Sequence, residues 1–170
     1  MPALRRAVGA GGHAGKLNPF AFTQEVRQWF DGPLALSGAI ANGGAVLAAQ
    51  AAGADLAYVG SPFIATAEAN AVPAYKQAVV DGRADDIVYS NLFTGVHGNY
   101  LRGSIVAAGL DPDALPQSDS SAMNFGSGAK AWKDIWGAGQ GIGAVDAVVP
   151  AADRIARMAA EYQAARARLL

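Results

Sequence analysis

The sequence predicts an α/β fold, in which short parallel strands alternate with helices. Residues 33–36 and 56–59 are uniformly apolar and bounded by turn residues, as strands buried within a parallel sheet are. A glycine turn follows each run at once, and the stretch between them is rich in small apolar residues. One turn, one helix and one strand therefore fill residues 38–60.

This spacing fits the repeating unit of an eight-stranded β/α barrel, which takes roughly 30 residues for each strand and helix. The chain has 170 residues, of which 52% are apolar, and is long enough for one domain with a core. We divide it into a partial β/α barrel of the TIM type at residues 1–93, a lid or insert of helices and loops at 94–145, and a C-terminal helix at 146–170 that returns to the barrel.

Composition narrows the classes of partner. A net charge of −1 gives no electrostatic reason to expect nucleic acid or an anionic membrane. The absence of cysteine excludes disulfides and is compatible with a cytoplasmic protein, and two histidines in unlike surroundings predict no metal site. Residues 1–8 contain two arginines without an apolar run behind them, so neither a signal peptide nor a membrane span is predicted there.

Local signals place the first helix. Asn18, followed by proline, is suited to cap a helix. Val26, Trp29 and Phe30 then fall at helical spacing and predict one apolar stripe. The Asp-Gly pair at residues 31–32 should end this helix.

Further elements follow the same logic. Asn42 is suited to cap a helix over residues 44–52, and residues 87–89 resemble a strand. Two more helices are predicted from apolar stripes, at Ala71, Val72, Tyr75 and Val79, and at Ile155, Met158, Ala159 and Tyr162.

The first glycine turn surrounds a histidine. His13 lies within residues 9–15 among four glycines, which let the backbone come close to a flat ligand. Its imidazole can accept or donate a proton near neutral pH. A histidine in a surface turn is the alternative, but such a turn needs one or two glycines rather than four.

The two later turns predict a phosphate site. Gly38 and Ala39 follow one strand, and Gly60 and Ser61 follow the next. Small residues leave backbone N–H groups unobstructed, and Ser61 adds a hydroxyl donor. Each turn alone is explained as a tight connection without a ligand; because the two occur one unit apart beside the histidine turn, we favour a site.

The remaining motifs and residues give weaker evidence of a functional site. Residues 9–14 and 139–144 both match the glycine spacing of dinucleotide-binding loops, but neither lies between a full strand and a helix, so we set nucleotide binding of that kind aside. His97 is interpreted as a structural loop residue, with substrate contact as the alternative. Trp132 and Trp136 are interpreted as packing within the lid rather than as a stacking platform.

Taken together, residues 11–15 (GGHAG), 37–41 (SGAIA) and 60–63 (GSPF) resemble the nitronate monooxygenases, flavin enzymes on a β/α barrel with an inserted helical domain. Residues 136–140 (WGAGQ) are similar to the family's segment near the return to the barrel. The resemblance runs from about Val8 to the end of the chain.

The resemblance implies FMN as cofactor, an alkyl nitronate or nitroalkane as substrate, and dioxygen as oxidant. His13 would be the catalytic base that removes the carbon-bound proton or assists nitronate oxidation. Gly11 and Gly12 would lie against the flavin, and its phosphate would be held by Gly38, Ala39, Gly60 and Ser61.

Two departures from the family pattern concern the phosphate. The first turn usually carries a second glycine where this chain has Ala39, a mild change because the N–H group remains. The second turn usually carries arginine where this chain has Pro62, so the hydroxyl of Ser61 is kept and the positive charge is lost.

A third departure from the family pattern concerns the N-terminal part of the chain. In the family the histidine turn follows the sixth barrel strand, so a chain that reaches it at residue 9 has too few strands to close a barrel. We therefore expect a fragment or one part of a larger assembly, completed by self-association or by a complementing N-terminal half-barrel. Two other functions stay open: an FMN-dependent enoyl-acyl-carrier-protein reductase, and a non-catalytic remnant of such a barrel.

Overall fold

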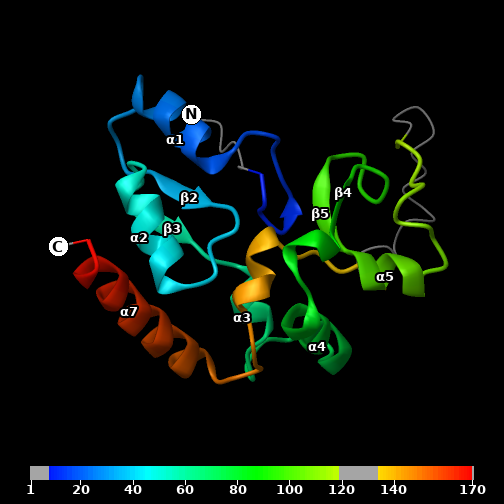
Figure 1. Cartoon of the computed structure of the whole chain (residues 1–170). Helices are drawn as coiled ribbons and strands as arrows, with labels where there is room; N and C mark the ends of the chain where they lie inside the picture. Colours follow the sequence, from blue (N-terminus) through cyan, green and yellow to red (C-terminus); the bar gives the residue numbers. More distant parts are fainter. Residues whose placement is uncertain (1–7, 119–133, 170) are drawn as a thin grey trace.

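The two predicted parallel strands form a small sheet in a computed structural model, which describes residues 8–118 and 134–169 (Figure 1). Strands β2 (Ala35–Ser37) and β3 (Leu56–Tyr58) pair in parallel, with Leu36 opposite Ala57. Helices α1 (Pro19–Arg27) and α2 (Gly43–Ala51) accompany them. The buried core of this part consists of Phe22, Leu36, Ile40, Ala49 and Ala54.

Both predicted helix caps are confirmed. The side chain of Asn18 accepts a hydrogen bond of 2.9 Å from the N–H of Phe20 at the start of α1. The side chain of Asn42 accepts one of 2.8 Å from the N–H of Ala45 at the start of α2. Each cap satisfies a backbone donor that the first turn of a helix leaves without a partner.

The predicted end of α1 is wrong, because the helix stops at Arg27 rather than at residues 31–32. The Arg27 side chain donates to the carbonyl oxygens of Phe30 and Gly32 at 3.0 and 2.8 Å, which holds the following residues in a turn. Trp29 leaves the helix with this turn and is 64% exposed, so it does not belong to a buried stripe.

Burial of β3 on both faces is not observed either. Leu36 is buried against the helices, whereas Leu56 and Tyr58 are 61% and 69% exposed. In a strand, alternate residues point to opposite faces, so these two side chains share the face that the helices do not cover. The parallel pair therefore has one packed face and one open face among the described residues.

The second part of the fold contains an antiparallel sheet. Its strands lie in the order β1 (Gly12–His13), β5 (Gly98–Leu101) and β4 (Ile87–Ser90). The strand predicted at residues 87–89 is thus present, but it is antiparallel to its neighbour. The sequence predicted no strand at β5, where all four residues are buried and no alternation of polar and apolar residues marks it.

Short helices surround this second sheet. They are α3 (Ser61–Ile64), α4 (Pro73–Asp81), α5 (Arg102–Ala107) and two 3₁₀ turns at Ala84–Asp86 and Gln140–Ala144. Helix α4 ends at Asp81, with Gly82 as its cap residue. A buried cluster ties these elements together: Ala65, Val79, Leu101, Ala138, Ile142 and Val145.

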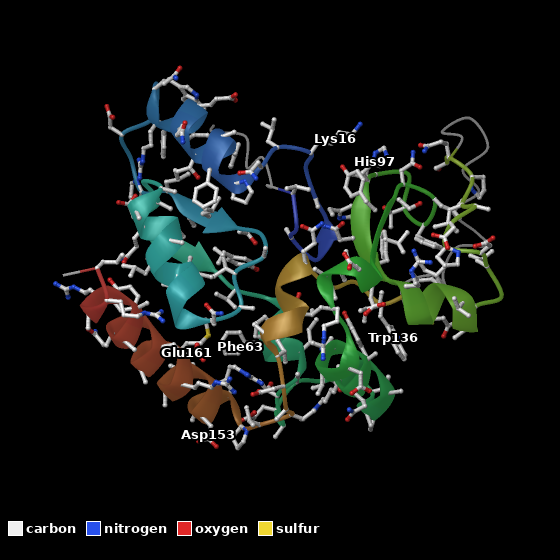
Figure 2. The ribbon with its side chains drawn as sticks, viewed as in Figure 1. Lys16, Phe63, His97, Trp136, Asp153 and Glu161 are labelled. Atoms are coloured by element: carbon white, nitrogen blue, oxygen red, sulfur yellow. The ribbon has the colours of Figure 1, made fainter. Side chains whose placement is uncertain are left out.

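The chain returns to the parallel sheet through α7 (Ala151–Ala167), which runs beside α2 (Figure 1). Gly43 lies at the closest approach, and its N–H donates to the Glu161 carboxylate at 2.9 Å (Figure 2). The predicted stripe is only partly correct, because Ile155 is 57% exposed while Arg154 and Ala165 are buried. No helix in the described part of the chain is long and apolar enough to cross a membrane.

Candidate functional site

The three glycine turns meet at one cavity of about 370 Å³. Its walls come from β1 and the residues before it, from the turns after β2 and β3, from α4, and from residues 135–141. All six residues that the sequence assigned to a cofactor line it: Gly11, Gly12, Gly38, Ala39, Gly60 and Ser61. Trp132 of the sequence analysis lies outside the described residues.

One carbonyl group joins three of these segments. The backbone oxygen of Gly9 accepts hydrogen bonds from the N–H of Ala39 at 3.1 Å and from the N–H of Gln140 at 3.0 Å. Nearby, the buried side chain of Asn99 donates to the carbonyl of Ala10 at 2.7 Å. The histidine turn is therefore fixed from two sides by backbone and amide groups.

The glycines of residues 137–141 are explained by close backbone packing. A Cβ on Gly11 would lie 2.9 Å from the N atom of Gly139, and a Cβ on Gly139 would collide with the carbonyl oxygen of Gly9. A Cβ on Gly141 would lie 2.8 Å from the carbonyl oxygen of Ala39. The second glycine-rich stretch is thus a wall of the same cavity, which sequence reasoning missed although its glycine spacing was the available signal.

Ala39 has an unusual backbone. Its φ of 54° lies in the left-handed region, and it is the only non-glycine residue with positive φ among residues 8–118 and 134–169. Its N–H group, which the sequence offered to a phosphate, instead donates to Gly9. Alanine in place of the family's second glycine keeps the backbone N–H group at position 39, but this group is already hydrogen-bonded within the chain.

The second turn is also partly engaged. The Oγ atom of Ser61 accepts a hydrogen bond of 2.8 Å from the N–H of Gly139, so its own hydrogen remains available to a ligand. Gly60 has an ordinary φ of −116°, and a Cβ added to it would meet no other atom within 4 Å. The folded chain does not itself require glycine at position 60, whereas a molecule held close to the backbone would.

Two aromatic rings form one wall. Tyr75 of α4 and Trp136 stack with ring centroids 5.2 Å apart and planes 13° from parallel, and both line the cavity (Figure 2). The Tyr75 hydroxyl donates to the carbonyl of Gly137. Burial raises the pKa of Tyr75 to about 12, so this hydroxyl stays protonated over the physiological range. Trp136 thus lies at the site, contrary to its interpretation as lid packing.

His13 adjoins the cavity through Gly12 but is not among the described residues that line it. Its Nε2 lies 3.2 Å from the hydroxyl oxygen of Thr94, and this hydroxyl donates its one hydrogen to the carbonyl of Val96 at 2.9 Å. Thr94 thus links the ring of His13 to the backbone of residue 96 and holds the imidazole in its orientation.

His97 lies on the other side of this turn. Its ring stacks on Tyr89 at a centroid distance of 4.9 Å, and its carbonyl accepts from the N–H of Ala14 at 3.0 Å (Figure 2). The Tyr89 hydroxyl donates to the carbonyl of Ala14 at 3.3 Å, and burial raises the pKa of Tyr89. These contacts match the structural role that the sequence favoured for His97.

The cavity is electrically neutral where the structure describes it. No Asp, Glu, Lys or Arg is found among its described lining residues. The described residues also contain no group of three His, Asp or Glu side chains that could hold a metal ion. What the cavity offers is glycine backbone, small hydroxyl groups and an aromatic wall, which suit a flat organic ligand.

Comparison with known proteins identifies relatives of this arrangement. The model of the nitronate monooxygenase family matches residues 7–161. A nitronate monooxygenase from Paraburkholderia phytofirmans is 27% identical over 118 residues, which are 64% of this chain and 32% of that protein.

Solved structures agree with this fold. Nitroalkane oxidase from Streptomyces ansochromogenes superposes with a TM-score of 0.76 at 27% identity, over 96% of this chain and 52% of that one. A mutant of FabK from Thermotoga maritima superposes with a TM-score of 0.77 at 24% identity, over 96% of this chain and 53% of that one. The chain thus spans about half the length of these structures, and it belongs to the nitronate monooxygenase family.

Proposed function

We propose that the chain is part of an FMN-dependent oxidoreductase that oxidises alkyl nitronates or nitroalkanes with dioxygen. The observation that carries this proposal is the meeting of three glycine turns at one cavity, with His13 directly beside Gly12. Membership of the nitronate monooxygenase family and the similarity to nitroalkane oxidase support an oxidoreductase of this kind.

The residues present fit the ring and chain of a flavin. The cavity volume lies within the range of small-molecule sites, which is roughly 300–1,000 Å³. The open space beside Gly60 leaves room for a ligand against this backbone. When bound, FMN supplies the electron-transfer chemistry that side chains alone lack.

In this proposal each turn has a separate task. Gly11 and Gly12 let the ring approach the backbone, and Gly38, Ala39, Gly60 and Ser61 border its phosphate end. Tyr75 and Trp136 exclude water from one wall. Thr94 contacts Nε2 of His13 and orients the imidazole, which acts as the base that accepts the carbon-bound proton of a nitroalkane.

We also infer that the parallel pair β2–β3 is a portion of a β/α barrel. The helices on one of its faces and the glycine turns after both strands support this, since ligand sites of such barrels lie at the carboxyl ends of the strands. The open face would then be covered by a complementing half-barrel or by a second copy. A cytoplasmic location is part of the same proposal.

The test uses His13→Ala and measures oxygen consumption with a neutral nitroalkane and with its preformed nitronate. Loss of the base should lower turnover of the nitroalkane by about 10²–10⁴-fold and affect the nitronate far less, because the nitronate has already lost the proton. The flavin absorbance band of the variant should match that of the wild type. Equal turnover of the nitroalkane by both proteins would remove His13 from the mechanism.

The same preparation separates the alternatives. A requirement for NADH, with reduction of an enoyl thioester, would favour the enoyl-acyl-carrier-protein reductase. A protein that takes up no flavin at all would favour the non-catalytic remnant and overturn the proposal.

A further inference from the structure

The cavity runs along the edge of the antiparallel sheet, where two glycines present bare backbone. Gly12 of β1 and Gly137, which is bridged to Tyr100 of β5, both line the cavity. A Cβ on Gly137 would lie 3.1 Å from the N atom of Gly12, so the two backbones pack together. A Cβ on Gly12 would meet no atom within 4 Å, so open space begins directly beside it. A flat ring can therefore reach the backbone along this edge.

His13 and Trp136 lie on opposite faces of this sheet. Residues paired across an antiparallel sheet share a face, so the side chain of His13, opposite Gly98, lies on the same face as Tyr100. Successive residues of a strand point to opposite faces, which places Leu101 on the other one. Trp136 packs against the buried cluster that contains Leu101, whereas Tyr100 belongs to a different cluster. The imidazole and the indole are thus on different sides of the sheet.

The cavity is lined from both faces. Ile135 belongs to the cluster of Tyr100 and so to the face of His13, whereas Trp136 and Tyr75 pack on the other face. Ile135, Trp136 and Tyr75 all line the cavity. A ligand that fills the cavity along the glycine edge therefore has the aromatic pair on one side and the face of His13 on the other.

Hydrogen bonds fix the aromatic pair in place. The N–H of Trp136 donates to the Oγ atom of Ser104 at 3.0 Å, and its carbonyl accepts from the N–H of Leu101 at 2.8 Å. The Tyr75 hydroxyl donates to the carbonyl of Gly137, and the Tyr75 ring stacks on Trp136. A wall that is already ordered loses little entropy when a ligand packs on it, and aromatic rings attract a third flat ring.

We propose that Trp136, supported by Tyr75, packs against the ring of the flavin, and that the substrate meets the flavin from the opposite side, beside His13. This inference rests on the proposed function, which places a flavin in the cavity. It assigns the aromatic wall to the cofactor and the face of His13 to the substrate.

The first experiment titrates FMN with the chain and follows the flavin fluorescence. The wild type should quench it, because a neighbouring indole quenches an excited flavin by reversible electron transfer. Trp136→Leu should weaken FMN binding by about tenfold, as expected for the loss of one stacking contact, and leave the bound flavin brighter. Trp29→Leu is the matched control, since Trp29 is 64% exposed and is not among the described residues that line the cavity. It should change neither quantity.

Trp136→Phe keeps a ring beside Tyr75 and decides the matter if circular dichroism shows that the leucine variant does not fold. Its dissociation constant for FMN should stay within about threefold of the wild type. The bound flavin should nevertheless be brighter, because a phenyl ring gives up an electron less readily than an indole.

A substrate series separates a cofactor contact from a substrate contact. At saturating FMN, the ratio of kcat/KM for nitroethane to that for 1-nitrobutane should agree within about twofold between the wild type and Trp136→Phe. If the indole touched the alkyl chain instead, the ratio should change by about tenfold or more.

The outcomes separate the two proposals. A changed ratio, or FMN affinity and fluorescence that no folded Trp136 variant alters, would overturn this inference and leave the proposed function standing. In a chain without turnover the fluorescence titrations alone decide the inference. A wild type that binds no flavin would overturn both.

Discussion

Ala39 holds a backbone conformation that its own side chain disfavours. Left-handed φ costs a residue with a Cβ about 1–2 kcal/mol, and the cost is accepted here at the edge of the cavity. The hydrogen bond from its N–H to Gly9 fixes the turn in this shape. Strain of this kind is most often stored next to a site that needs one particular loop geometry.

Ala39→Gly should therefore stabilise the protein slightly. Relief of the strain outweighs the greater freedom of glycine in the unfolded chain, and the free energy of unfolding should rise by about 0.5 kcal/mol. Ala39→Val should lower it by about 1–2 kcal/mol, because a β-branched residue tolerates positive φ least. Urea unfolding of the three proteins measures both changes. A Val variant as stable as the wild type would show that the turn is not held in this conformation.

The stability of the folded protein should depend on pH through Tyr75, in a direction that its raised pKa determines. The protonated phenol is favoured in the folded state, where the pKa is about 12 instead of the ordinary 10.0, because burial disfavours the phenolate. The stabilisation is complete below pH 10 and is lost as the pH rises toward 12. Between pH 9 and 11 the wild type should lose about 1.4 kcal/mol of stability from this group alone.

Tyr75→Phe removes that loss. The variant should be less stable than the wild type at pH 9 by about 1–2 kcal/mol, since the carbonyl of Gly137 loses its donor, and the gap should narrow as the pH rises. Tyr58→Phe, at an exposed position on the same cavity, is the control for the loss of a hydroxyl group and should change the stability little. Urea unfolding across the pH series tests this; a constant gap would contradict it.

Residue-scale chemistry was only partly predictable from sequence. The glycines around His13 indicated a close approach, and the cavity lies against them. The partners of the Ala39 N–H and of Ser61 were not predictable, because they are Gly9 and Gly139, which reach these turns only through tertiary packing. A neighbour that distant in sequence leaves no local signal.

At the scale of elements, the contact between α2 and α7 depends on Gly43. A Cβ at this position would collide with the backbone of Met158 and Tyr162 on α7, whereas a Cβ on Gly44 would meet its nearest atom at 3.4 Å. The two glycines are neighbours at the start of the same helix. They therefore form a matched pair for testing how closely the helices pack.

Gly43→Ala should lower the free energy of unfolding by about 1–3 kcal/mol or more, because neither backbone can move without separating the helices. Gly44→Ala should raise it by about 0.5–1 kcal/mol, because alanine favours the helix and has room. Thermal unfolding of both variants gives the comparison. Equal effects of the two substitutions would mean that α2 and α7 are not in direct backbone contact.

Some helix and strand boundaries are fixed by neighbouring residues, and others by residues that are distant in sequence. The caps at Asn18 and Asn42 are made within one turn, and the sequence located both helix starts correctly. The end of α1 depends on Arg27 reaching the carbonyls beyond it, and β5 exists because it is buried between two other strands. Such tertiary causes override local propensity and are not visible in a window of sequence.

At the scale of the whole molecule, the convergence of the three turns followed from a general property of parallel strands. The turns after β2 and β3 lie at the same edge of the sheet, so the sequence could place Gly38 and Gly60 together. No comparable general property of the sequence predicts the antiparallel arrangement of β1, β4 and β5. The sequence therefore predicted the meeting of the turns better than the architecture that surrounds them.

The open face of β2 and β3 should make the chain associate in solution. Two strands with helices on one side only are marginal, and exposed apolar side chains on a sheet face attract another surface. Leu56 and Tyr58 are large, apolar or aromatic, and more than half exposed on this face. We expect sedimentation velocity to show a mass that increases with protein concentration.

Leu56→Lys should shift this protein toward the monomer, because a charge on the open face must be desolvated whenever a partner covers it. Ile155→Lys is the matched control: it makes the same kind of change at an aliphatic residue of similar exposure, but on the outer side of α7. That variant should associate as the wild type does. A wild type that stays monomeric at all concentrations, or two variants that behave alike, would show that the open face is not the surface on which copies or a complementing half-barrel meet.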